Sequence, residues 1–223
     1  MKALVTGANG FTGSHLVKAL IQRGATIVAY VRPSSQLDRL SELPITYAYG
    51  DITDRAALSS AMVGVDTVFH TAAYVELGLV DAAAMERVNF QGTQAVLAAA
   101  KDAQVSKMVY CSTIGVFGDT QGQVVDETFQ RTQTNFSSAY DRTKYLAQRA
   151  VDAAAKQGLD VVSVLPSGIF GSDDPQLARA RLVELQQEDA AVIAEKQSRR
   201  QHTRLGADTA GWNTPKDNGR AGR

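Results

Sequence analysis

A tyrosine and a lysine four residues apart, Tyr140 and Lys144, form a pair with definable chemistry. They lie in a segment with helical periodicity, so both side chains share one face of the helix and can meet. An unperturbed phenol has a pKa of about 10 and is a poor base near neutral pH. A nearby ammonium favours the phenolate, so we expect Lys144 to lower the pKa of Tyr140. Such a pair could take a proton from a substrate hydroxyl or return it.

A hydroxyl group follows a predicted buried strand over residues 105–112. Thr113 comes one residue after this strand, at the edge of a parallel sheet where ligands of open α/β folds bind. Its hydroxyl could hydrogen-bond the substrate oxygen that gains or loses the proton, and the neighbouring Ser112 is a less favoured substitute. The Tyr-x-x-x-Lys spacing alone occurs by chance in many helices. The hydroxyl at the strand end is what favours a catalytic interpretation.

Three glycines at G-x-x-G-x-x-G spacing, Gly7, Gly10 and Gly13, separate the first predicted strand from the first predicted helix. In dinucleotide-binding turns the first glycine allows a sharp turn and the second allows a pyrophosphate to approach. The third lets helix and strand pack closely. The helix N-terminus adds unpaired N–H groups and about half a positive charge. A tight turn that binds no ligand is the alternative interpretation.

Short apolar runs alternate with longer helical patterns over the first 175 residues. The expected strands cover residues 2–6, 26–31, 45–49, 67–71, 105–112 and 161–165. The expected helices cover residues 11–23, 36–43, 54–62, 82–103 and 137–157. This alternation, with several strands apolar throughout, predicts an α/β fold: a doubly wound parallel sheet, Rossmann-like, with helices on both faces.

Seven ordered motifs resemble those of the extended short-chain dehydrogenase/reductases, also called NAD-dependent epimerase/dehydratases. They cover residues 6–13, 50–53, 68–73, 88–93, 111–118, 140–144 and 165–171. The resemblance extends over residues 1 to about 174 and looks closest to dihydroflavonol-reductase-like members and related sugar epimerases. It implies an NAD(P)-dependent reductase, epimerase or dehydratase. Such an enzyme transfers hydride at a secondary alcohol or ketone of a small molecule or nucleotide sugar.

The resemblance also implies roles for individual residues. The expected catalytic residues are Thr113, Tyr140 and Lys144, with Tyr140 as the acid or base and Lys144 also binding the nicotinamide ribose. The expected cofactor-binding residues are Gly7, Asn9, Gly10, Phe11, Gly13, Arg32, Asp51, Ile52, Ala72, Tyr140, Lys144 and Pro166. Within this set, Asp51 and Ile52 would hold the adenine end, and Ala72 would lie beside the nicotinamide ribose.

Arg32 stands at the end of the second predicted strand, where the choice between the two nicotinamide cofactors is normally made. An acid there would bind the ribose 2′-hydroxyl, but the first acid after this strand is Asp38. Arg32 offers a planar set of donors to a 2′-phosphate, with Ser34 or Ser35 assisting. We therefore expect NADP, with NAD as the second choice. A solvated loop charge is the alternative interpretation of Arg32.

Composition limits the other function classes. The 223 residues include 23 basic and 23 acidic side chains, so no net charge attracts nucleic acid or an anionic membrane. One cysteine and three scattered histidines predict neither an internal disulfide nor a metal site. No apolar run approaches the roughly 18 residues of a membrane helix, and the N-terminus does not read as a signal peptide. We expect a cytoplasmic protein with a small-molecule substrate and, from the resemblance alone, a homodimer.

The domain prediction is a dinucleotide-binding domain with the catalytic site over residues 1–175 and an atypical tail over 176–223. One helix near 176–195 and then disorder are expected in the tail, which is polar at its end. The family's later motifs and its substrate domain do not follow, so the tail could be a truncated or frameshifted end. Two alternatives therefore stay open: a non-catalytic regulator that binds NADP, and an inactive fragment of a longer enzyme.

Overall fold

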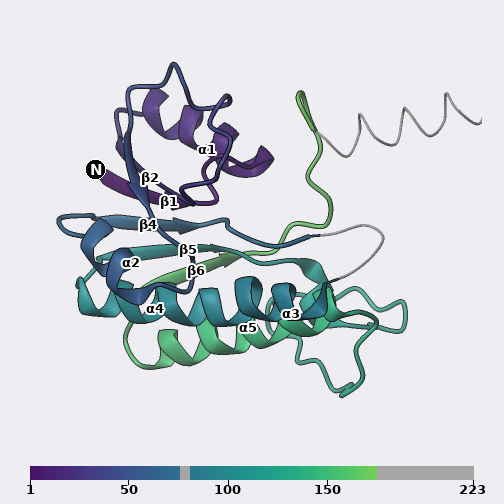
Figure 1. The fold of residues 1–223 in the computed structure, drawn as a ribbon. Coiled ribbons are helices and arrows are strands. Elements are labelled where there is room, and N and C mark those ends of the chain that lie inside the picture. Colours follow the sequence, from purple (N-terminus) through teal and green to yellow (C-terminus); the bar gives the residue numbers. More distant parts are fainter. Residues whose placement is uncertain (76–80, 175–223) are drawn as a thin grey trace, which may run out of the picture. The chain divides into compact units, whose positions relative to one another are not determined.

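Six parallel strands form a single sheet in the order β3-β2-β1-β4-β5-β6 (Figure 1). They are β1 (Lys2–Thr6), β2 (Thr26–Val31), β3 (Thr46–Tyr49), β4 (Thr67–His70), β5 (Lys107–Cys111) and β6 (Val161–Val164). This computed structural model describes residues 1–75 and 81–174, so the predictions for the tail lie outside the described residues. The strand order runs outward in both directions from β1 and β4. The crevice between these strands is where open α/β sheets bind ligands.

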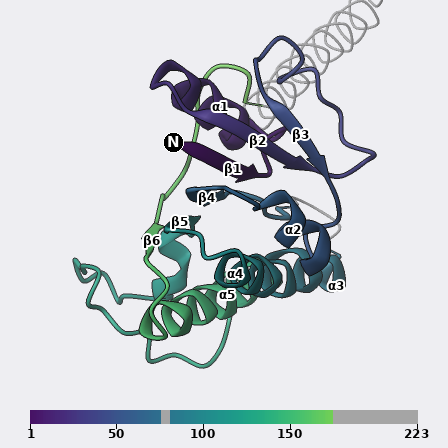
Figure 2. The same cartoon turned by 90° about the vertical axis from the view of Figure 1, so that its left-hand side faces the viewer.

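Helices cover both faces of the sheet. They are α1 (Phe11–Gln22), α2 (Arg55–Ala61), α3 (Ala82–Met85), α4 (Gly92–Asp102) and α5 (Ala139–Lys156), with a π-helical turn η1 (Glu86–Gln91) and a 3-10 turn η2 (Ile114–Phe117). Figures 1 and 2 show α1 on one face and α2, α4 and α5 on the other. The predicted doubly wound parallel sheet is confirmed.

Two apolar clusters, one on each face of the sheet, form the core. Side chains alternate along a strand, so Leu4 of β1 packs with the cluster under α2, α4 and α5, whereas Val5 packs with the cluster under α1. Both side chains are fully buried. β1 and β2 are buried on both faces, which explains why their sequences are apolar throughout. The predicted bounds of both strands are confirmed.

The helix expected over residues 36–43 is wrong. This segment folds into successive turns, in which the N–H of Leu40 bonds to Leu37 O and the N–H of Leu43 bonds to Leu40 O. Helix formation has a costly nucleus, so eight residues have little intrinsic tendency to become helical. Here the turns already bury Leu40 completely in the cluster under α1.

The single helix expected over residues 82–103 is interrupted. Its middle turn, η1, is π-helical and lies between α3 and α4. π-Helical turns occur often at functional sites. η1 contains Arg87 and the buried Asn89, which are both described below.

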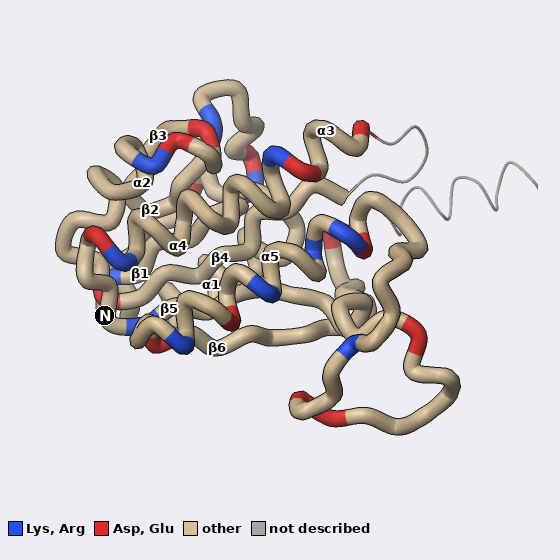
Figure 3. The backbone as a smooth tube through the Cα atoms, turned by 90° about the horizontal axis from the view of Figure 1, so that it is seen from below, with Lys and Arg blue, Asp and Glu red and all other residues tan. Residues whose placement is uncertain are grey.

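Charged side chains of both signs are spread over the described residues. Figure 3 shows Lys and Arg interspersed with Asp and Glu along the elements. Within residues 1–75 and 81–174, no cluster of three or more His, Cys, Asp or Glu side chains could bind a metal ion. The helices of that same part are all too short or too polar to cross a bilayer.

Candidate active site

The turn between β1 and α1 is built from direct contacts between main chains. Gly7 has a φ of +67°, and a Cβ there would lie 2.8 Å from the main chain of Ala72. A Cβ on Gly13 would lie 2.1 Å from Gly7 O. Glycine is therefore required at both positions by close approach. Gly10 is the N-cap of α1, and no side chain of the described residues caps it, so the N–H groups of the first turn suit an anion.

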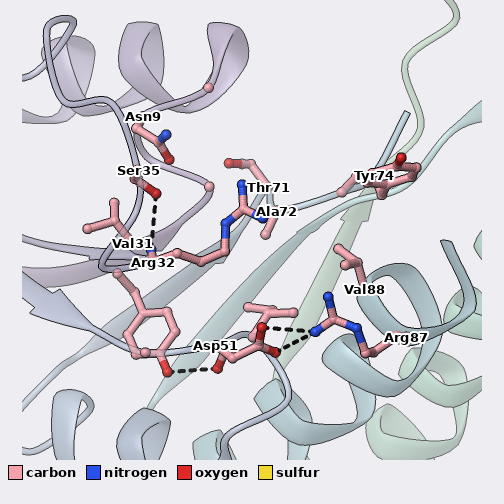
Figure 4. Close-up of a pocket in the computed structure, with 16 residues that line it drawn as sticks. Asn9, Val31, Arg32, Ser35, Asp51, Thr71, Ala72, Tyr74, Arg87 and Val88 are labelled. Atoms are coloured by element: carbon pink, nitrogen blue, oxygen red, sulfur yellow. Dashed lines mark hydrogen bonds and ion pairs between the residues drawn. The ribbon is translucent and has the colours of Figure 1, made fainter. Parts of the chain in front are cut away.

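A cavity of about 270 Å³ opens beside this turn, at the crevice of the sheet. Seven of the predicted cofactor-binding residues line it, namely Gly7, Asn9, Gly10, Arg32, Asp51, Ile52 and Ala72. Ser35, Tyr74 and Arg87 also contribute to its wall (Figure 4). The carboxyl ends of the first four strands thus supply one concave surface of the kind that takes a nucleotide.

Arg32 enters the cavity from the end of β2. Figure 4 shows its side chain extending toward Thr71 and Ala72. Its main-chain N–H donates to Ser35 Oγ at 3.1 Å, which holds that hydroxyl near the same wall. A guanidinium beside a hydroxyl provides the donors that a phosphate group accepts from.

Asp51 also lies in the cavity wall and is held as an anion. Its carboxylate accepts the Thr53 N–H at 3.0 Å and the Thr53 hydroxyl at 2.7 Å, and it pairs with Arg87 at 2.9 Å (Figure 4). These bonds, the two from Thr53 foremost, outweigh burial and lower the pKa of Asp51 to about 2. The Tyr30 hydroxyl donates to Asp51 O at 3.0 Å. Asp51 therefore presents a charged acceptor at any ordinary pH.

The predicted catalytic residues lie around the carboxyl end of β5. Lys144 comes from α5, and its Nζ donates to Cys111 O at 2.7 Å and to the Tyr110 hydroxyl at 3.0 Å. Thr113 is the N-cap of η2, where its Oγ1 accepts the Gly115 N–H at 3.2 Å. Pro166 lies nearby, because its carbonyl accepts the N–H of Ile114 at 3.1 Å.

The electrostatics of the lysine and the tyrosine differ from the sequence prediction. Lys144 is 3% exposed, and burial lowers its pKa to about 8, against a smaller upward effect of Cys111. Burial raises the pKa of Tyr140, and Cys111 adds to this. The expected lowering by Lys144 is therefore wrong for this structure. The ammonium is engaged by Tyr110 and a carbonyl, and desolvation of the phenol acts in the opposite direction.

Several predicted residues lie outside the cavity wall as it is described. Phe11 is the first residue of α1, with its ring 5.1 Å from that of His15. Gly13 is buried behind the turn. Among the described residues, the wall also does not include Tyr140, Lys144 or Pro166. The structure thus brings the predicted site together in two groups, one at the cavity and one at the end of β5.

Asn89 joins these two groups, and sequence reasoning gave it no role. Its Oδ1 accepts the Tyr74 N–H at 2.7 Å, and its Nδ2 donates to Tyr74 O at 3.1 Å and to Thr143 Oγ1 at 3.2 Å. The Thr143 hydroxyl in turn donates to Tyr140 O at 3.1 Å. A π-helical turn has no clear sequence signature. The only indication of a role for Asn89 in the sequence was therefore its place in the motif over residues 88–93.

Comparisons with known proteins agree with this arrangement. The profile of the 3-beta hydroxysteroid dehydrogenase/isomerase family matches residues 4–207. A Synechocystis sp. protein provisionally named dihydroflavonol 4-reductase is 40% identical over 173 residues, which are 76% of this chain and 50% of that protein. The 3-beta-hydroxysteroid dehydrogenase of Mycolicibacterium neoaurum is 36% identical over 186 residues, 80% of this chain and 50% of that protein.

A solved structure is similar as well. The UDP-glucuronic acid 4-epimerase of Bacillus cereus, in complex with NAD, is 27% identical with a TM-score of 0.70. The match covers 85% of this chain and 64% of that one. The chain spans about half the length of the curated relatives that it matches.

Proposed function

The chain belongs to the 3-beta hydroxysteroid dehydrogenase/isomerase family, and from that premise we propose a nicotinamide-dependent oxidoreductase of the extended short-chain dehydrogenase/reductase type. The proposed reaction transfers hydride at a secondary alcohol or ketone of a small molecule or nucleotide sugar. One observation carries the proposal. Asn89 bonds both to Tyr74 in the cavity wall and to the turn of α5 that bears Tyr140, so the nucleotide cavity and the proton-handling group adjoin.

The residues of the cavity fit a dinucleotide. Gly7 and Gly13 allow the tight turn and the close packing of α1 on β1, and Gly10 at the uncapped start of α1 leaves the main chain open to a pyrophosphate. Asp51 would accept a hydrogen bond at the adenine end, with its charge maintained by Thr53 and Arg87. The nicotinamide, when bound, would supply or accept the hydride.

In the proposed reaction Tyr140 donates a proton to the substrate oxygen or accepts one from it, while Thr113 hydrogen-bonds the same oxygen. The raised pKa of Tyr140 keeps the phenol protonated, which is the form that ketone reduction needs, but it also makes the phenol a weaker acid. Proton removal from an alcohol needs a cation near the phenol. Lys144 is the candidate, and it would have to exchange its bonds to Tyr110 and Cys111 O for bonds to a ribose hydroxyl.

Replacing Tyr140 tests the catalytic part of this proposal. Oxidation of NADPH is followed with a panel of ketones and nucleotide sugars for the wild type and Tyr140→Phe. Loss of the acid–base hydroxyl should lower turnover by at least about a hundredfold and leave cofactor affinity within about twofold. The exposed Tyr49→Phe serves as the control. Full activity of Tyr140→Phe would refute the assignment, and binding without any turnover by the wild type would favour the non-catalytic regulator.

We propose further that the cofactor is NADP. Arg32 and Ser35 supply donors to a 2′-phosphate. Asp51, the acid in the same wall, already accepts hydrogen bonds from Thr53 and pairs with Arg87, so it is less suited to bind a 2′-hydroxyl. Arg32→Ala should weaken NADP binding about tenfold or more and leave NAD binding nearly unchanged, as measured by calorimetry. Arg32→Lys keeps the charge but loses the planar fork, so we expect an intermediate affinity. Equal affinity of the wild type for both cofactors, unaltered in Arg32→Ala, would overturn this proposal.

A further inference from the structure

Arg131 is buried in a long segment, residues 118–138, that joins η2 to α5 without a helix or strand. Its side chain is 3% exposed. The guanidinium donates twice to the Asp141 carboxylate, at 2.6 and 3.2 Å, and once to Asn135 O at 2.6 Å. Its Nε donates to Gln133 O at 3.3 Å. One planar group therefore organises a segment that has no regular hydrogen bonding of its own.

On one side, Arg131 reaches the first turn of α5. Asp141 follows Tyr140 directly and is 12% exposed. Its carboxylate also accepts the N–H of Ser137 at 2.9 Å and the hydroxyl of Ser137 at 3.1 Å. Burial would raise the pKa of Asp141, but the bonds from Arg131 and Ser137 outweigh it and lower the pKa. The turn that bears Tyr140 is thus built around a buried ion pair.

On the other side, Arg131 contacts the end of η2, the turn that begins at Thr113. Gly118 closes this turn with a φ of +70°. A Cβ on Gly118 would lie 3.0 Å from Arg131 Nε and 2.8 Å from Gln133 Oε1. Gln133 Nε2 also donates to Asp119 O at 2.6 Å. The glycine allows the 118–138 segment to pack directly on this end of η2.

Aromatic rings hold the guanidinium plane in place. The Arg131 guanidinium carbon lies 4.5 Å from the centroid of the Phe136 ring and 5.2 Å from that of Tyr145. Stacking of this kind favours a planar cation, so lysine is not an equivalent replacement.

We propose that Arg131 is a positioning residue. It fastens the turn that begins at Thr113 to the turn that bears Tyr140 and so sets the spacing of the two groups that hold the substrate oxygen. The proposal rests on the proposed function for its catalytic meaning. Small displacements of reacting groups reduce rates strongly, by about a hundredfold for a shift of about 1 Å. Arg131 lies apart from the cavity lining, so its loss should affect turnover and not cofactor binding.

The test compares Arg131→Met, Arg131→Lys and the control Arg149→Met in the full chain. Arg149 is exposed on α5 and has a loose ion pair with Asp152 at 3.9 Å. Three quantities are measured: kcat, the dissociation constant for NADPH, and amide hydrogen exchange over residues 113–118 and 137–145. For Arg131→Met we expect kcat to fall at least about tenfold and NADPH affinity to stay within about twofold. Amide exchange should accelerate in both segments of Arg131→Met. Arg131→Lys should show the same loss of kcat and the same faster exchange, and the control Arg149→Met should show neither change.

Two results would overturn the proposal. Exchange that accelerates only within residues 119–136 would show that Arg131 merely orders its own segment. Unchanged kcat despite faster exchange in both flanking segments would show that the spacing does not matter for catalysis. If the wild type turns over no substrate, the proposed function fails, and the exchange pattern alone still decides whether Arg131 fastens the two turns.

A second variant covers the case in which Arg131→Met does not fold. Arg131→Met/Asp141→Leu removes both buried charges, and such replacements restore stability because no unpaired charge is left. The double variant should fold and bind NADPH, yet keep the low kcat. Recovery of wild-type kcat in the double variant would also contradict the positioning role.

Discussion

Lys144 keeps an ammonium group almost completely out of water. Only 3% of the residue is exposed, and the pKa falls from its ordinary value of 10.5 to about 8, chiefly through burial. The charged form is therefore held in the folded protein at a cost in stability. If Lys144 is needed for function, a variant without this charge is expected to be more stable and less active than the wild type.

The pH dependence of unfolding tests this cost. Between pH 8 and 10.5 the unfolded chain holds a proton on Lys144 that the folded chain has released, so stability rises with pH in this window. As the pH rises through this window, the free energy of unfolding of the wild type should increase by up to about 3 kcal/mol relative to that of Lys144→Met, since one pKa unit corresponds to about 1.36 kcal/mol. Denaturant unfolding of both proteins at pH 7.5, 9 and 10 measures the difference. A constant difference across this range would show that the ammonium is solvated.

At the scale of single residues, the sequence indicated which residue types stand at which spacing, but not the hydrogen-bond partners of their side chains. The pair of Tyr140 and Lys144 could be chosen from its helical spacing and from the strand-end hydroxyl of Thr113. The bonds of Lys144 to Cys111 O and the Tyr110 hydroxyl depend on how α5 packs on β5, which no local pattern reports. Arg131 was missed for the same reason. Its partners come from the fold of a segment without regular structure.

The joint between β1 and α1 determines whether a pyrophosphate can approach. Gly13→Ala would push a Cβ against Gly7 O, and neither main chain can yield without opening the turn. Such overpacking costs about 1–3 kcal/mol. We expect a lower unfolding temperature and loss of detectable NADPH binding in a thermal scan. The control is Gly168→Ala, where a Cβ meets no atom within 4 Å, and its unfolding temperature should match that of the wild type. Wild-type binding by Gly13→Ala would contradict the proposed pyrophosphate position.

At the level of elements, the helices and strands that could be predicted from the sequence were those with a clear burial pattern and clear turn residues at their ends. β1 and β2 are apolar on both faces and end at turn residues, so their bounds could be predicted to the residue. The turns over residues 36–43 resemble a helix in sequence because Leu37, Leu40 and Leu43 recur every three residues, a spacing that successive turns also satisfy. The π-helical turn η1 contains Asn89, whose bonds to Tyr74 and Thr143 exist only in the assembled fold.

On the scale of the molecule, the predicted family resemblance and fold class are confirmed by the family profile and the sheet order. The cytoplasmic location and the homodimer stay predictions. The described part from Met1 to Ile169 forms one compact unit and contains both the cavity and the proposed catalytic group. Because the chain spans about half the length of its curated relatives, the ability of this unit to bind a cofactor is the question that precedes all others.

A thermal unfolding scan of the 223-residue chain without ligand, with NADPH and with NADH answers that question most directly. A ligand at about 100 times its dissociation constant adds about 2.7 kcal/mol, which is several degrees for a domain of this size. We predict one cooperative transition that shifts upward with cofactor, and more with NADPH than with NADH. A chain without a cooperative transition, or one that neither cofactor shifts, would contradict the dinucleotide site and with it the proposed oxidoreductase.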